Sequence, residues 1–176
     1  MPRLSFAPAP AHNPAMTQDP FRPADDDART LAARLVADAR TAALGVIVPG
    51  TGEPMVTRAA FALTPEGAPL TLVSDLAPHT AALRANPAAS LLIGEPGGKG
   101  DPLAHPRLTL QARAAFVTRD SDRRAVLRAA MLARQPKAAL YIDFADFHLV
   151  EFTVGSALLN GGFGRAYRLS PADLGL

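Results

Sequence analysis

The chain has 176 residues, of which 48% are hydrophobic and 19% charged, a composition typical of one globular domain with a real core and not of a disordered chain. Its formal net charge is only +2, and its arginines are scattered, which argues against a nucleic-acid-binding stripe. The absence of cysteine excludes thiolate metal sites, disulfides and a cysteine nucleophile. No apolar run approaches the roughly 20 residues that span a bilayer, so we expect no membrane partner.

The N-terminal segment differs in composition from the rest of the chain. Residues 1–24 contain six prolines and show no periodicity, so we expect a flexible leader there and a folded domain over residues 25–176. The leader lacks the continuous apolar region of a secretory signal, which favours a cytoplasmic protein. Met16 is an alternative start of the chain, and the sequence does not choose between the two.

The remaining sequence alternates between helical and extended patterns. A first helix opens at the acids Asp25 to Asp27, where the helix dipole favours negative charge, and its apolar stripe ends near Ala43. A short helix over residues 79–84 ends before Asn86-Pro87, and a third helix begins at Asp120 and stops before Pro136. Strands are expected at residues 44–48, 55–63, 70–73, 90–93, 107–117, 148–154 and 163–169. Their hairpin-like spacing predicts a mainly β fold, an antiparallel sheet or barrel with flanking helices.

One turn stands out because polar side chains gather where a strand ends and a helix begins. Ser74, His79 and Thr80 combine two hydroxyls, an imidazole and helix-start amides, which can hold an anion such as phosphate. The alternative is that Ser74 and Thr80 only cap the turn and that His79 is a surface histidine. Both interpretations stay open at this level.

Other chemistries lack their sequence patterns. The four histidines show none of the paired spacings of zinc sites, so we expect no metal site of that kind. The Gly-x-Ser-x-Gly elbow and the Rossmann fingerprint are absent, and the glycines of residues 95–102 are not followed by the Lys-Ser/Thr and helix of a phosphate-binding loop. The best remaining candidate site, which suits an anionic cofactor, consists of Arg58, Ser74, His79, Thr80 and Arg107.

Five segments carry a family resemblance. They are Thr57 to Phe61, Leu72 to Thr80, Asn86 to Leu92, Asp101 to Leu110 and Asn160 to Ala166. Together they resemble the pyridoxamine 5′-phosphate oxidase family of FMN-binding split barrels, and within it the haem-utilisation (HugZ-like) branch more than the vitamin-making enzymes. The resemblance runs from about Asp25 to the C-terminus.

The resemblance implies an antiparallel split β-barrel of six to seven strands that forms a homodimer with two FMN sites between its subunits. Arg58 would bind the FMN phosphate or the flavin edge, and Arg107 falls where the partner subunit usually reaches over the cofactor. The cofactor-binding residues implied in this way are Arg58, Ala59, Ser74, Asp75, His79, Thr80 and Arg107. The chain has no tryptophan, although the vitamin-making enzymes use one to grip their substrate, which argues against pyridoxamine phosphate oxidation.

Several functions follow as hypotheses. The first is an FMN-dependent oxidoreductase that acts on an unknown small substrate. The second is a haem-binding or haem-degrading protein in which a histidine is the axial ligand. In haem-degrading relatives an additional C-terminal segment commonly supplies that histidine, and this sequence ends at Leu176 without one. A non-catalytic flavin-binding module and a barrel that has lost its cofactor are the remaining alternatives.

Overall fold

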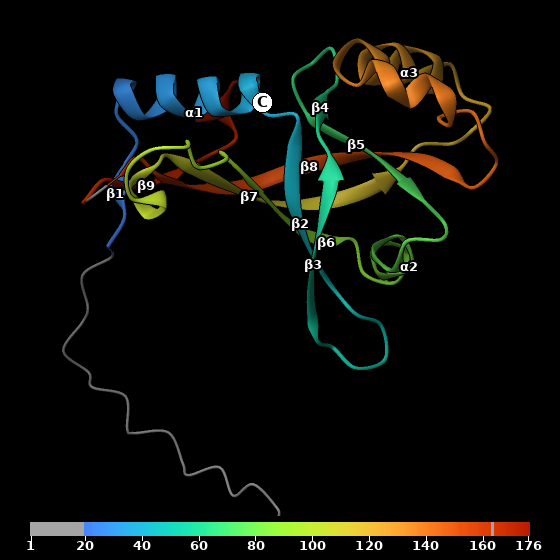
Figure 1. The fold of residues 1–176 in the computed structure, drawn as a ribbon, viewed down its shortest axis with the longest axis horizontal. Helices are drawn as coiled ribbons and strands as arrows, with labels where there is room; N and C mark the ends of the chain where they lie inside the picture. Colours follow the sequence, from blue (N-terminus) through green and yellow to red (C-terminus); the bar gives the residue numbers. More distant parts are fainter. Residues whose placement is uncertain (1–19, 163) are drawn as a thin grey trace, which may run out of the picture.

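In the part of the chain that the structure describes, the fold is a single nine-stranded sheet with three α-helices packed around it (Figure 1). The computed structural model describes residues 20–162 and 164–176. The strands are β1 (Arg22–Pro23), β2 (Thr41–Ile47), β3 (Pro54–Ala60), β4 (Ala62–Leu63), β5 (Pro69–Ser74), β6 (Ala88–Ile93), β7 (Arg107–Phe116), β8 (Phe147–Asn160) and β9 (Ala166–Leu169). The α-helices are α1 (Asp26–Asp38), α2 (Pro78–Ala85) and α3 (Asp122–Arg134), and 3-10 turns cover Pro102–Ala104, Pro136–Leu140 and Ala172–Leu174.

The strands close into a split barrel. Neighbouring strands run in the order β1-β9-β8-β7-β6-β2-β3, while β5 pairs with β8 on one side and with β4 on the other. β4 follows β3 directly after Phe61 and pairs with β5, which in turn pairs with β8. The β3–β4 segment at one end of the strand order is thereby connected to β8, which closes the barrel. All pairs are antiparallel except β1 with β9. The mainly β split barrel predicted from the sequence is therefore confirmed.

Period-two alternation places the core inside the barrel. Along β2, Ala42, Leu44 and Val46 are buried while the residues between them face outward. Phe61 and Phe152 are among the largest fully buried side chains of this core. A second apolar cluster lies under α3, on the opposite face of β5 and β8; it consists of Ala62, Leu70, Leu72, Leu127, Met131, Ala138, Ile142 and Leu149.

Element boundaries differ from the sequence prediction in several places. The first helix ends at Asp38 and not near Ala43, because Thr41 already pairs with Ala60 and the alternating burial of β2 overrides the helical stripe. The strand β8 extends to Asn160, six residues beyond its predicted end, since it pairs with all of β7 past an irregularity at Gln111. The last strand begins at Ala166.

The predicted leader is only partly described. Residues 1–19 lie outside the described part of the chain. Arg22 and Pro23, which the prediction assigned to the leader, form β1 and pair in parallel with Tyr167 and Arg168 of β9. The sheet thus begins a few residues before the predicted domain boundary.

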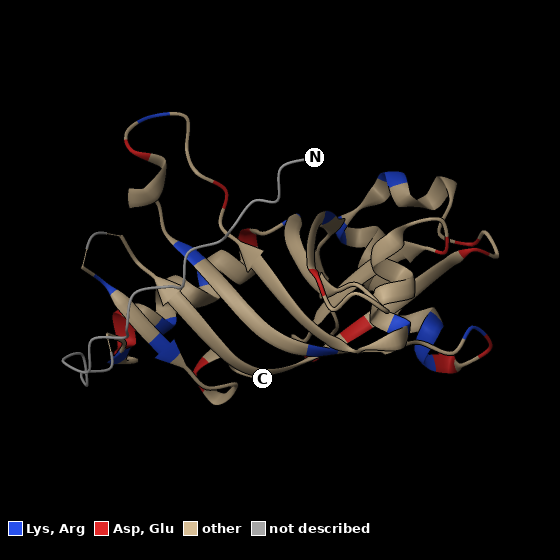
Figure 2. Cartoon of the chain, turned by 90° about the horizontal axis from the view of Figure 1, so that it is seen from below, with Lys and Arg blue, Asp and Glu red and all other residues tan. Residues whose placement is uncertain are grey.

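Charged residues lie mainly outside the strands (Figure 2). Figure 2 shows acidic and basic residues mostly in helices and loops, whereas the long strands are largely uncharged. The loop between β6 and β7 is folded around His105, whose Nδ1 accepts from the Gly97 amide at 3.2 Å and whose Nε2 lies 2.9 Å from the Lys99 carbonyl.

Within residues 20–162 and 164–176, no helix has the length and apolar character needed to cross a membrane.

Candidate functional site

The predicted anion-binding turn is the corner between β5 and α2, and its hydroxyls are occupied by the protein itself. Ser74 Oγ donates to Asp146 Oδ2 at 2.8 Å and accepts from the Leu76 amide at 3.2 Å. Thr80 is buried, and its Oγ1 donates to the Ser74 carbonyl at 2.6 Å. These bonds fix the strand-to-helix corner. These contacts agree with the interpretation that Ser74 and Thr80 stabilise the turn, while an anion site at the corner stays a prediction.

The same corner carries acidic side chains. Asp75 Oδ2 lies 2.8 Å from His148 Nε2, and Asp75 Oδ1 accepts from Arg84 at 3.2 Å. The hydrogen bond from His148, followed by that from Arg84, lowers the pKa of Asp75, although burial opposes the shift. With Asp146 bonded to Ser74, two carboxylates face the corner. Their negative charge does not favour a phosphate bound by these hydroxyls.

His148 belongs to a small packed cluster at this end of the barrel. The Arg84 guanidinium lies 4.3 Å from the centre of the Phe116 ring, and Phe116 meets His148 edge-on with ring centres 6.1 Å apart. The β5–β8 pairing creates the cluster, because it sets Val73 opposite His148. Sequence reasoning missed His148, Arg84, Phe116 and Asp146 as members of the corner. Their only local signal was placement at strand and helix ends.

His79 lies on the first turn of α2 and contacts β3. Its Nδ1 is 3.0 Å from Thr57 Oγ1, while its Nε2 makes no hydrogen bond with any described residue. The side chain is half-buried, and this burial lowers its pKa below the ordinary value of an imidazole. A histidine with a lowered pKa is neutral at pH 7, which is the form that ligates metals.

Arg58 and Ala59 lie beside Thr57 on β3 but differ in accessibility. Arg58 is exposed on the outer face of the strand and makes no hydrogen bond or ion pair with other described residues. Ala59 is buried inside the barrel. Because side chains alternate along a strand, Arg58 points to the face opposite Thr57 and its partner His79. Arg58 and His79, which were both predicted to bind the ligand, therefore lie on opposite faces of β3 and do not converge.

Arg107 lies at the far end of β7. Its Nη1 donates to the Leu103 carbonyl at 2.9 Å. Phe116 at the corner is nine positions further along β7, roughly 30 Å away at about 3.4 Å per residue. Within one chain Arg107 therefore lies far from Ser74 and Thr80, and the five-residue site stays a prediction. That the partner subunit supplies Arg107 stays a prediction.

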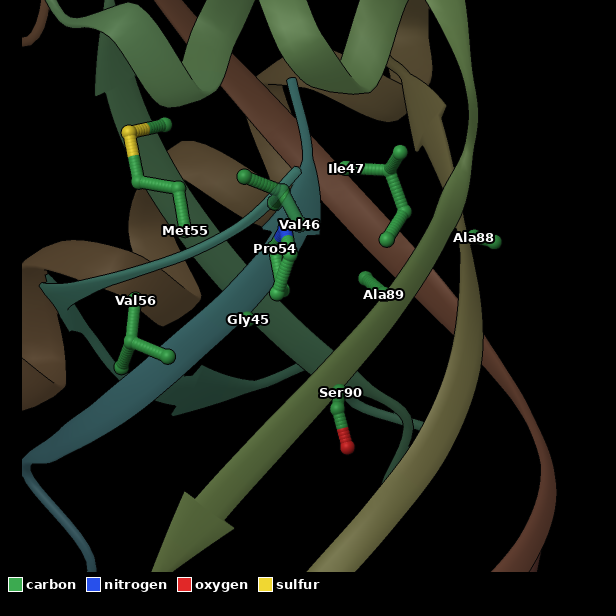
Figure 3. A pocket seen from close by; sticks show the side chains of 9 residues that line it. All are labelled: Gly45, Val46, Ile47, Pro54, Met55, Val56, Ala88, Ala89 and Ser90. Atoms are coloured by element: carbon green, nitrogen blue, oxygen red, sulfur yellow. The ribbon is translucent and has the colours of Figure 1, made fainter. Parts of the chain in front are cut away.

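An apolar groove, which sequence reasoning also missed, opens where the β2–β3 hairpin meets the start of β6 (Figure 3). Its volume is about 270 Å³. It is lined by Gly45, Val46, Ile47, Pro54, Met55, Val56, Ala88, Ala89 and Ser90. In Figure 3 the thioether of Met55 points toward α2, which passes across the top of the view. Val56 in this groove is 68% exposed, and the only hint in the sequence was an apolar residue at a strand position that alternation turns outward.

Multidentate metal binding has no support in the part of the chain that is described. There, no three His, Asp or Glu side chains come close enough together to hold a metal ion. A ligand whose metal needs only one protein nitrogen, such as haem, places no such demand on the chain.

Comparison with known proteins identifies relatives along most of the chain. The family model for the CREG β-barrel matches residues 23–174. The non-canonical haem oxygenase HOZ, chloroplastic, of Arabidopsis thaliana is 42% identical over 96 residues, which are 54% of this chain but only 28% of the plant protein. Haem oxygenase HutZ of Vibrio cholerae is 33% identical over 129 residues, which are 72% of this chain and 73% of HutZ.

Solved structures agree with this assignment. A haem-binding protein from Mycobacterium smegmatis has a TM-score of 0.77 at 31% identity, over 88% of this chain and 61% of that protein. A pyridoxinephosphate oxidase family protein from Clostridium acetobutylicum shares the fold, with a TM-score of 0.65 at 14% identity over 86% of this chain and 99% of that one. The chain therefore belongs to the CREG β-barrel family, with the pyridoxamine 5′-phosphate oxidase-like split-barrel fold.

Proposed function

We propose that this protein binds haem and degrades it as a haem oxygenase. The observation that carries the proposal is the 33% identity to HutZ over 72% of the chain, a span that includes most of the barrel. The haem-binding protein of Mycobacterium smegmatis supports it with a similar fold at 31% identity. The haem alternative thereby takes precedence over the FMN-dependent oxidoreductase that was the first hypothesis.

The described residues fit the chemistry of haem. The macrocycle is flat and largely apolar, and the groove beside Met55 offers an apolar wall. The iron needs a neutral imidazole, and His79 has one with an unbonded nitrogen. Arg58 lies on the face of β3 opposite Thr57 and His79, so we assign it no contact with a haem that His79 holds. Haem would be both the substrate and the source of the iron that activates oxygen.

Titration with hemin tests the proposal. We expect a Soret band of bound haem and a Kd below about 10 µM, equivalent to roughly 7 kcal/mol of binding free energy. Addition of a reductant under air, with catalase present to remove free peroxide, should bleach the Soret band and release iron and an open-chain tetrapyrrole. Binding without bleaching would reduce the function to haem binding. No Soret change at tens of micromolar hemin would refute the proposal.

An FMN-binding oxidoreductase is the second candidate. The exposed Arg58 guanidinium and the fold shared with a pyridoxinephosphate oxidase family protein support it. The hydroxyls of Ser74 and Thr80, which are already bonded within the corner, do not. Absorption of the purified protein and chromatography of its released chromophore distinguish the two candidates, because a two-banded flavin spectrum would favour FMN.

We also propose that two copies of the chain associate. Three large apolar side chains on the outer face of the sheet, Ile47, Val56 and Leu92, are 37%, 68% and 40% exposed. Ile47 and Val56 line the groove, and Leu92 lies on the adjoining β6. Their burial against a second copy would remove apolar surface from water. Light scattering should give the mass of a dimer, and Val56→Asp should shift it toward the monomer. A wild-type monomer at micromolar concentration would contradict this arrangement.

A further inference from the structure

His79 stands out among the histidines of the barrel because the outermost nitrogen of its ring is unbonded. We propose that His79 ligates the haem iron through Nε2, with Thr57 holding the ring and the Met55 end of the groove receiving the macrocycle. The inference rests on the proposed haem-binding function and names the ligand that the function requires.

The three described histidines differ in which nitrogen they leave available. Nε2 lies at the tip of an imidazole, whereas Nδ1 lies next to the Cβ atom and the main chain, so a wide flat macrocycle reaches Nε2 without collision. His148 has Nε2 bonded to Asp75, and His105 has both nitrogens bonded within its loop. Only His79, among these three, has Nδ1 engaged and Nε2 without a hydrogen bond.

The contact with Thr57 sets the orientation of the His79 ring. Thr57 Oγ1 lies 3.0 Å from Nδ1 and accepts a hydrogen bond when the Nδ1 proton is present. That tautomer leaves the lone pair on Nε2. Metal-ligating histidines commonly donate their other N–H to an oxygen in this way, which fixes the ring and raises its basicity. Burial lowers the pKa of the imidazole and so favours the neutral form, which is the form that binds iron.

The groove provides the apolar side of the site. Met55 and Thr57 lie two residues apart on the same face of β3, so the groove begins about 7 Å from the residue that contacts His79. Met55 points toward α2, the helix that carries His79 (Figure 3). A macrocycle ligated by His79 could thus cover Met55 and the small residues of β6.

Spectroscopy of three proteins tests the assignment. Wild type, His79→Ala and His148→Gln are titrated with hemin, and resonance Raman spectra of the reduced complexes report the Fe–N(histidine) stretch. His148→Gln is the matched control, since it removes a second partly buried histidine from the same end of the barrel. We expect His79→Ala to lose the Fe–N(histidine) band and at least tenfold in hemin affinity. Free imidazole should restore the band, and His148→Gln should resemble wild type.

Each contrary result has a distinct meaning. Wild type that takes up no hemin refutes the proposed function, and the ligand assignment fails with it. If wild type binds hemin but lacks an Fe–N(histidine) band, or if His79→Ala keeps one, the assignment is wrong while haem binding stands. Should circular dichroism show that His79→Ala does not fold, Thr57→Val decides: it retains the imidazole but removes its oxygen partner, so the Fe–N(histidine) frequency should fall. An unchanged frequency would overturn the assignment.

Discussion

The substitution Thr80→Val separates a structural corner from an anion-binding one. Thr80 is 1% exposed and donates its hydroxyl to the Ser74 carbonyl at 2.6 Å. Valine has nearly the same shape, so the change removes the hydrogen bond and creates little cavity. The Ser74 carbonyl still accepts from the Ala77 amide at 3.0 Å, so it is not left unsatisfied. The free energy of unfolding should therefore fall by about 1 kcal/mol, the net value of one hydrogen bond.

The assay is chemical denaturation together with ligand titration. For a domain of this size, about 1 kcal/mol corresponds to a Tm decrease of roughly 2–4 °C. Thr153→Val on the outer face of β8 is the matched control, because Thr153 is exposed, and it should change stability by less than about 0.5 kcal/mol. Affinities for hemin and FMN should be unchanged in Thr80→Val. Unchanged stability together with tenfold weaker FMN binding would refute the structural interpretation of this hydroxyl.

Three further changes test the fold and its pH dependence. The Arg123 guanidinium, with help from the Thr64 hydroxyl, lowers the pKa of Glu66 from its ordinary value of about 4.5 to about 2. The stabilising effect of this ion pair is therefore complete above pH 4.5 and is lost as pH falls toward 2. Glu66→Gln should flatten the stability curve in that window, measured by urea unfolding at several pH values. Gly94→Ala should cost roughly 2 kcal/mol, because Gly94 has a φ of +98° and a Cβ there lies 2.6 Å from the Pro106 carbonyl oxygen. Leu127→Ala should cost about 2–5 kcal/mol in the same assay, since Leu127 is fully buried under α3.

Each of these has a matched control. Glu53 is exposed and forms no ion pair with a described residue, so Glu53→Gln should change the free energy of unfolding by less than about 0.5 kcal/mol. A methyl group at Gly98 meets no atom within 4 Å, so Gly98→Ala should be tolerated. Val126→Ala on the exposed face of α3 should cost far less than Leu127→Ala. The strain argument would fail if Gly98→Ala destabilised the protein as much as Gly94→Ala. The packing argument would fail if Val126→Ala destabilised it as much as Leu127→Ala.

Local patterns in the sequence were sufficient for the type and order of the main elements. Alternating burial along β2 and β7, caps such as Ser121 at the start of α3, and the proline after Asn86 act over a few residues. They therefore appear in the sequence itself. Boundaries were less certain where two patterns overlapped, as at Thr41, because pairing with β3 decides which one prevails.

For the candidate site, too, the sequence identified individual residues but not the contacts between them. The sequence identified His79 as a residue of interest, and it also singled out Ser74 and Thr80. It could not show that Ser74 is bonded to Asp146, 72 residues away, or that His148 is bonded to Asp75, 73 residues away. These contacts exist only because β5 pairs with β8.

Tertiary structure also decided which candidate side chains can act together. Alternation along β3 sends Arg58 outward and Thr57 toward His79, and the length of β7 keeps Arg107 away from the corner. The sequence by itself determined a mainly β fold, an antiparallel sheet or barrel with flanking helices, and polar groups at a strand-to-helix corner, since strand, helix and turn preferences are local; the split barrel was implied by the family resemblance. Which of those groups remain free for a ligand depended on long-range strand pairing, since a hydroxyl or imidazole is available only if no distant residue is bonded to it.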